Sequence, residues 1–313
     1  MRPTKLHPGD VDLRVALGPL QLRNPILTAS GCFASGQEID QFFEVAALGA
    51  VVVKSLTLEP RLGLPTPRMA ETASGMLNAI GLQNPGIDRW LETDLPWLDA
   101  RSVPTIVSIA GKTVQEYRVM AERLRGQPGI IAIEANISCP NVDDRDRVFA
   151  CKEDTTRAVI QTITRVADQP VFAKLTPDVT DIAVIAGAAR AAGAVGVSLI
   201  NTLLGMAIDV ETRRPRLAAV TGGLSGPAIK PVAVRAVHQV HRAFPDFPII
   251  GMGGVRSVTD VVELLLAGAS AVAIGTATFA NPLAAHDLLA ELPHWLAAHG
   301  CASVRELTGA VQL

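Results

Sequence analysis

Short apolar runs alternate with amphipathic segments along most of this chain. A run of buried residues that ends in polar or small residues is typical of a strand in a parallel sheet. Such runs occur at residues 24–31, 50–53, 105–109, 131–135, 171–175, 196–200, 248–254 and 270–276. Between several of them, helical spacing predicts helices over residues 39–48, 114–124, 155–166, 182–192, 231–243 and 259–267.

This alternation favours an α/β fold, and specifically a closed (βα)8 TIM barrel. An open doubly wound sheet is the rival fold, but no G-x-G-x-x-G motif follows the first predicted strand. Residues 11–22 alternate around Gly18-Pro19, which predicts a short N-terminal hairpin. Residues 56–82 and 203–226 show no helical period, so we expect ligand loops or a small subdomain at the C-terminal face. No linker is visible, and residues 1–313 are expected to form a single domain.

The composition agrees with a large α/β core and argues against several functions. Apolar residues make up 49% of the chain and aromatic residues only 4%, which suits strands buried on both faces. The net charge of -2 has no block of like charges, so neither nucleic acid nor a membrane is an expected partner. No signal peptide or membrane-spanning run is visible, and a cytoplasmic location is expected. The 4 cysteines lack metal-ligand spacing, so no metal site is expected.

Polar residues collect at the predicted carboxyl ends of the strands, where a barrel builds its active site. These residues are Ser30, Lys54, Ser108, Asn136, Cys139, Lys174, Asn201 and Thr202. Paired carboxylates for glycoside hydrolysis and clusters of metal ligands are missing from this set. Simpler interpretations stay open at this point, since Cys139 could be a buried structural thiol and Lys54 could lie on the exposed rim.

Glycines follow the last two predicted strands, at Gly253-Gly254 and Gly275-Thr276. Barrels often bind phosphate there, through backbone N–H groups that glycine leaves uncovered. Amides can recognise the pyrimidine-like edge of a flavin, and a lysine can stabilise its anionic reduced form. The strand ends therefore favour a flavin over a metal.

Several segments together make the chain resemble a known family over nearly its full length. They include Asn136-Ile137-Ser138-Cys139-Pro140-Asn141 and residues 29–33, 54–55, 59–61, 65–68, 78–86, 200–202, 221–231 and 251–255. With these residues the chain resembles the class 1 dihydroorotate dehydrogenases, and class 1B in particular. The resemblance implies an FMN-containing barrel that oxidises (S)-dihydroorotate to orotate in pyrimidine synthesis.

The resemblance also implies roles for individual residues. Cys139 would be the base that takes the C5 proton while hydride passes from C6 to flavin N5. The implied substrate-binding residues are Lys54, Asn78, Ala79, Ile80, Gly81, Leu82, Asn136, Asn201 and Thr202. The implied FMN-binding residues are Ser30, Lys54, Ser55, Ser108, Asn136, Lys174, Ile200, Gly226, Gly253, Gly254, Gly275 and Thr276.

Two features depart from the family pattern. Ser108 stands where the family usually has an asparagine that contacts the flavin, and the charged segment 143–147 replaces a Gly-containing, less charged loop. These departures suggest one alternative, an FMN oxidoreductase acting on another dihydropyrimidine, such as dihydrouracil. A second alternative is a non-catalytic flavin- or pyrimidine-binding barrel, and Cys139 argues against it. Class 1B enzymes work with a subunit that carries FAD and an iron–sulfur cluster and reduces NAD⁺. The resemblance therefore implies such a partner, and a homodimer of the catalytic chain.

Overall fold

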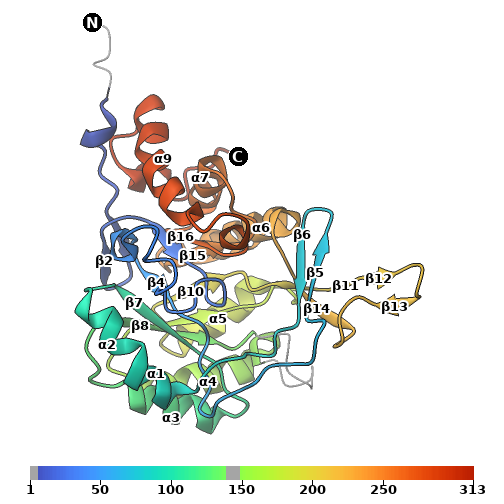
Figure 1. Cartoon of the computed structure of the whole chain (residues 1–313). Helices are drawn as coiled ribbons and strands as arrows, with labels where there is room; N and C mark the ends of the chain where they lie inside the picture. The colour runs from blue at the N-terminus through green and yellow to red at the C-terminus, as the bar shows by residue number, and fades with distance from the viewer. Residues whose placement is uncertain (1–5, 139–148) are drawn as a thin grey trace, which may run out of the picture.

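The computed structural model describes residues 6–138 and 149–313, and a parallel barrel forms its centre (Figure 1). Eight strands lie side by side in chain order around this barrel. They are β3 (Ile26–Thr28), β4 (Val51–Val52), β7 (Thr105–Ile109), β8 (Ile130–Asn136), β9 (Val171–Lys174), β10 (Gly196–Leu199), β15 (Ile249–Met252) and β16 (Ala271–Ile274). The predicted (βα)8 architecture is confirmed.

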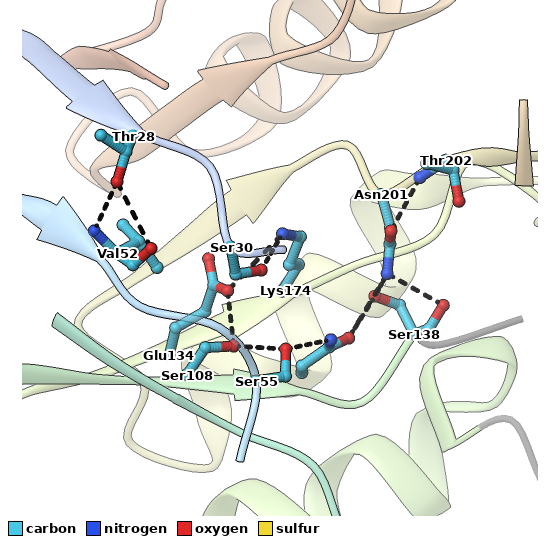
Figure 2. A network of polar contacts seen from close by, with 11 residues as sticks. Thr28, Ser30, Val52, Ser55, Ser108, Glu134, Ser138, Lys174, Asn201 and Thr202 are labelled. Atoms are coloured by element: carbon cyan, nitrogen blue, oxygen red, sulfur yellow. Dashed lines mark hydrogen bonds and ion pairs between the residues drawn. The ribbon is translucent and has the colours of Figure 1, made fainter. Parts of the chain in front are cut away.

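The barrel closes where β3, the first strand, meets β4. Backbone pairing is short at this seam, where Leu27 and Ala50 form an isolated parallel bridge. The side chain of Thr28 extends the seam, because its Oγ1 accepts a hydrogen bond from the N–H of Val52 at 2.9 Å and donates to the Val52 carbonyl at 3.3 Å (Figure 2). A buried hydroxyl thus satisfies backbone groups that a longer ladder would pair.

Helices cover the outside of the barrel (Figure 1). They are α1 (Ile87–Thr93), α2 (Leu95–Ala100), α3 (Val114–Leu124), α4 (Glu153–Thr164), α5 (Ile182–Ala191), α6 (Lys230–Ala243), α7 (Val258–Ala267), α8 (Ala277–Ala280) and α9 (Ala284–Ala298). In α3 the sequence reason is plain: Thr113 caps the first turn by accepting from the Glu116 N–H, and Tyr117, Met120 and Leu124 form the buried stripe. Five of the six predicted helices are confirmed within two residues at each end.

The sixth predicted helix, over residues 39–48, is wrong. This segment forms a series of turns and then the short 3-10 helix η2 (Val45–Ala47). The carboxylate of Asp40 accepts a hydrogen bond from the Val45 N–H at 3.1 Å, and this local bond competes with a helical ladder. Val45 and Leu48 are nevertheless fully buried in the main core. The spacing of the apolar residues therefore reflects the packing of a loop and not that of a helix.

The remaining strands lie outside the barrel. The predicted N-terminal hairpin is confirmed as β1 (Val15–Leu17) and β2 (Leu20–Leu22). The two long segments without helical period pair with each other in an antiparallel sheet of order β11-β14-β6-β5. We call it the roof sheet; its strands are β5 (Met69–Thr72), β6 (Gly75–Asn78), β11 (Leu203–Met206) and β14 (Thr221–Ser225). A small hairpin, β12 (Ile208–Asp209) and β13 (Arg214–Pro215), projects away from it (Figure 1).

Candidate active site

A cavity of about 670 Å³ lies between the carboxyl ends of the barrel strands and the roof sheet. A smaller hollow of about 130 Å³ shares Ser30, Lys174 and Asn201 with it, so the two form one continuous site. Barrel strands supply one wall, and β5, β6 and β14 supply the other. The two long segments, which were expected to form ligand loops or a small subdomain, therefore supply a wall of the site.

One end of the larger cavity is formed by glycine backbone. Gly226, Gly253, Gly254 and Gly275 line it, and the first three have φ values of +92°, +127° and +79°. A Cβ on Gly254 would lie 2.7 Å from the Cβ of Lys230 and 3.0 Å from the carbonyl oxygen of Gly226. Glycine is required here by both conformation and space, and it leaves backbone N–H groups accessible to an anion.

A charged cluster connects the N-terminal turns of α6 and α7 beside this glycine end. The Nζ of Lys230, in the first turn of α6, lies 2.7 Å from Asp260 Oδ1 and 2.7 Å from Glu263 Oε2. Asp260 also accepts from the backbone N–H of Arg256 at 2.9 Å and of Ser257 at 2.8 Å, in the capping box of α7. Burial alone would raise the pKa of Asp260, but the hydrogen bonds from Lys230, Arg256 and Ser257 outweigh burial and lower it.

Acid should weaken the fold through this cluster. Because the pKa of Asp260 is lower in the folded chain than the ordinary value of 3.8, its stabilisation is present above that value and is lost as the pH falls through the folded pKa. We expect Asp260→Asn to lower the urea midpoint at pH 7 and the difference from the wild type to shrink below about pH 4. Urea unfolding at a series of pH values measures this. A difference that stays constant down to about pH 3 would contradict it.

Lys174 brings a buried positive charge to the same cavity. Its side chain is 4% exposed, and its Nζ donates to Ser30 Oγ at 2.8 Å (Figure 2). The Nζ also lies 3.5 Å from Oε1 of Glu134, a fully buried carboxylate on β8. An ion pair of this kind offsets part of the cost of removing both charges from water.

Two asparagines form the neighbouring wall. Asn201 Nδ2 donates to Asn136 Oδ1 at 3.3 Å and to Ser138 Oγ at 3.0 Å. Asn136 Nδ2 donates to Ser55 Oγ at 2.9 Å, and the hydroxyl of Tyr117 donates to the Asn136 carbonyl at 2.8 Å. Hydrogen bonds within the protein thus fix both amides at the hollow, which suits recognition of a planar polar ligand.

The structure brings most of the predicted substrate residues together. The smaller hollow is lined by Lys54, Asn78, Ile80, Leu82, Asn136, Asn201 and Thr202. Ala79 and Gly81 do not line it. Ala79 is fully buried against Leu77 and Leu217, and Gly81 is a buried position with a φ of +76° beside Leu64.

The predicted FMN residues divide between the two parts of the site. The larger cavity is lined by Ser30, Lys174, Ile200, Gly226, Gly253, Gly254, Gly275 and Thr276, and the smaller hollow by Lys54, Ser55 and Asn136. Ser108 lines neither, because it is fully buried behind Ser55 and Glu134. Cys139 and the segment 143–147 lie outside the described residues.

Sequence analysis missed other residues of the site. Glu134 received no role, although a carboxylate inside an otherwise apolar strand was a usable signal, since buried charges need partners. Met69 and Phe279 line both parts of the site and gave no signal in the sequence. Cys32 also lines both parts, where burial raises the pKa of its thiol despite Lys174 and Lys54 nearby.

Comparison with known proteins decides the family. The family model described as dihydroorotate dehydrogenase matches residues 12–296. The chain belongs to the dihydroorotate dehydrogenase family. This family is flavin-dependent and forms orotate in pyrimidine biosynthesis, so the resemblance seen in the sequence is confirmed at the level of family and activity.

Curated relatives agree with this dihydroorotate dehydrogenase assignment. The chain is 50% identical over 297 residues to the dihydroorotate dehydrogenase B (NAD(+)) catalytic subunit of Bacillus pumilus, covering 95% of this chain and 96% of the relative. The protein of the same name from Geobacillus kaustophilus is also 50% identical, with 95% of each chain covered. That of Listeria monocytogenes serotype 4b is 50% identical over 295 residues, or 94% of this chain and 97% of the relative.

Membrane-spanning helices and metal clusters are both missing from the described part of the chain. Within residues 6–138 and 149–313, no helix is long and apolar enough to cross a membrane. In the same residues, no group of three or more His, Cys, Asp or Glu side chains is arranged to hold a metal ion.

Proposed function

We propose that this chain is the catalytic subunit of an NAD⁺-linked dihydroorotate dehydrogenase that binds FMN and oxidises (S)-dihydroorotate to orotate. The observation that carries the proposal is the continuous site, which joins a glycine end to a buried lysine and two held amides. The relatives at 50% identity, each named dihydroorotate dehydrogenase B (NAD(+)), catalytic subunit, support the substrate and the electron acceptor.

The residues present fit FMN. Gly253, Gly254 and Gly275 line the larger cavity without side chains, which leaves their backbone N–H groups accessible to a phosphate. Lys174, 4% exposed, supplies a cation to the middle of the cavity, where an anionic reduced flavin needs one. When bound, FMN would supply the acceptor for the hydride from C6 of the substrate.

The chain's own side chains would bind and orient dihydroorotate in the smaller hollow. Asn78, Asn136 and Asn201 offer amide groups that match the donors and acceptors of a pyrimidine ring, and Lys54 offers a positive charge to its carboxylate. The roof sheet would shield this hollow from water through Met69 and Met76. By the family resemblance, Cys139 would take the C5 proton.

We also propose a single-domain chain, a homodimer and a partner subunit that carries FAD and an iron–sulfur cluster. The shared barrel core, which spans both halves of the chain, supports one domain. The words "catalytic subunit" in the relatives' names support the partner, and the class 1B resemblance supports its cofactors and the homodimer.

The proposal is tested by mixing the purified yellow protein with dihydroorotate under anaerobic conditions and following flavin absorbance. We expect rapid bleaching with formation of orotate, and no bleaching with dihydrouracil. Bleaching by dihydrouracil and not by dihydroorotate would assign another substrate. A protein that takes up no FMN would refute the proposed cofactor.

A further inference from the structure

A hydrogen-bond chain of fixed direction connects the substrate amides to Glu134. A carboxylate only accepts, so Ser108 Oγ donates its proton to Glu134 Oε1 at 2.9 Å. Ser108 must then accept from Ser55 Oγ, which lies 2.9 Å away (Figure 2). Because the Ser55 proton is used there, Ser55 Oγ accepts from Asn136 Nδ2 at 2.9 Å.

The direction of this hydrogen-bond chain determines the orientation of both side-chain amides, those of Asn136 and Asn201. With Nδ2 of Asn136 committed to Ser55, its Oδ1 is left to accept from Asn201 Nδ2 at 3.3 Å. Asn201 Oδ1 in turn accepts from the backbone N–H of Thr202 at 2.8 Å. Such networks determine which way an amide is oriented. The donors and acceptors that Asn136 and Asn201 present to the smaller hollow therefore depend on Glu134, although Glu134 does not line this hollow.

The same carboxylate also acts on the cofactor side. Oε1 of Glu134 lies 3.5 Å from the Nζ of Lys174, and both side chains are at most 4% exposed. At such burial the carboxylate strongly reduces the electric field of the ammonium at the cavity. Oε2 of Glu134 is buried and has no hydrogen-bond partner among the described residues.

We infer that Glu134 is a positioning residue with two separable effects, one on the amides of Asn136 and Asn201 and one on the charge that Lys174 presents to the flavin. This inference rests on the proposed function. The two effects depend on different contacts of Glu134. The hydrogen bond from Ser108 mediates the effect on the amides, and the ion pair with Lys174 mediates the effect on the charge. They can therefore be tested by different substitutions.

Glu134→Gln tests the charge effect. Glutamine keeps an oxygen at the Oε1 position for Ser108 and Lys174, and its nitrogen takes the unpartnered Oε2 position. Loss of one negative charge beside Lys174 favours the anionic reduced flavin. We expect the two-electron midpoint potential of the bound FMN to become more positive by about 30 mV, a tenfold change in the equilibrium constant. The dissociation constant of orotate should change by no more than about twofold.

Ser108→Ala tests the amide effect. It breaks the chain between Ser55 and Glu134 and leaves the Glu134–Lys174 ion pair in place. We expect orotate to bind about tenfold more weakly, and the KM for dihydroorotate to rise more than kcat falls, because the amides can rotate away from the ligand. The midpoint potential should remain that of the wild type.

Glu122→Gln is the matched control, because Glu122 is an exposed carboxylate paired with Arg118 on α3. It should change neither the potential nor orotate binding.

A Glu134→Gln protein whose potential is unchanged or more negative overturns the charge effect, and a Ser108→Ala protein with wild-type orotate affinity overturns the amide effect. A wild-type protein that binds no FMN, or is not bleached by dihydroorotate, would instead refute the proposed function. If Glu134→Gln does not fold, Ser108→Ala still tests the amide effect. Glu134→Asp then tests the charge effect, because it draws the carboxylate away from Lys174 and should also make the potential more positive.

Discussion

Replacing Cys139 with alanine is expected to slow the reduction of the bound flavin by dihydroorotate by about 10²- to 10⁴-fold, the usual contribution of a general base. In the proposed mechanism this thiol takes the C5 proton as hydride leaves C6, and alanine cannot accept that proton. Binding of orotate should be nearly unchanged, because the amides and Lys54 that would hold the ring are intact. Stopped-flow absorbance under anaerobic conditions measures the rate.

Cys301→Ala is the control for this prediction. Cys301 is a half-buried free cysteine that packs against the main core and lines neither part of the site. Its loss should leave flavin reduction unchanged. If Cys139→Ala reduces its flavin as fast as the wild type, the thiol is not the base and another group must take the proton.

Replacing Gly254 with alanine is expected to remove FMN from the purified protein. The residue has a φ of +79°, and its new Cβ would lie 2.7 Å from the Cβ of Lys230 and 3.0 Å from the Gly226 oxygen. Neither neighbour can move freely, since Lys230 is held by Asp260 and Glu263. The backbone at the glycine end must shift, and we expect the FMN dissociation constant to rise at least about tenfold, or about 1.4 kcal/mol. Titration of the apoprotein, followed by flavin fluorescence, measures it.

Gly300→Ala separates the clash from backbone strain. Gly300 has a similar φ of +73°, but a Cβ at this position would have no neighbour within 4 Å, and the residue lines neither part of the site. This variant should lose about 1 kcal/mol of stability and keep wild-type FMN affinity. Full retention of FMN by Gly254→Ala would contradict the proposed place of the phosphate.

The barrel itself was predictable because each of its strands is an apolar run of its own. Val51–Val52 and Ala271–Ile274, for example, are buried on both faces and read as strands without knowledge of their partners. The strand ends were predictable for the same reason, since the carboxyl ends of parallel strands meet at one face. Lys174, Asn136 and Asn201 were therefore correctly expected to lie near one another.

Features that depend on distant partners were not predictable. Strand β14 contains glycine and polar residues, and β5 mixes apolar with polar residues; both lie outside the barrel and pair only within the roof sheet. The place of Ser108 depended on Glu134, whose carboxylate holds its hydroxyl behind the wall of the site. The wrong helix over residues 39–48 had a different, local origin, because the turn-forming hydrogen bond from the Val45 N–H to Asp40 is not visible in the spacing of apolar residues.

The roof sheet has a consequence for the order in which the molecule folds. The hydrogen bond between Asn78 and Gly223 joins residues 145 positions apart, and four barrel strands lie between them in the chain. Contacts of such long range form slowly, because a large loop must close before they stabilise anything. We therefore expect this wall of the cavity to be completed after these four strands have assembled. The FMN proposed for the cavity would then act on a late stage of folding, as a ligand that traps the finished molecule.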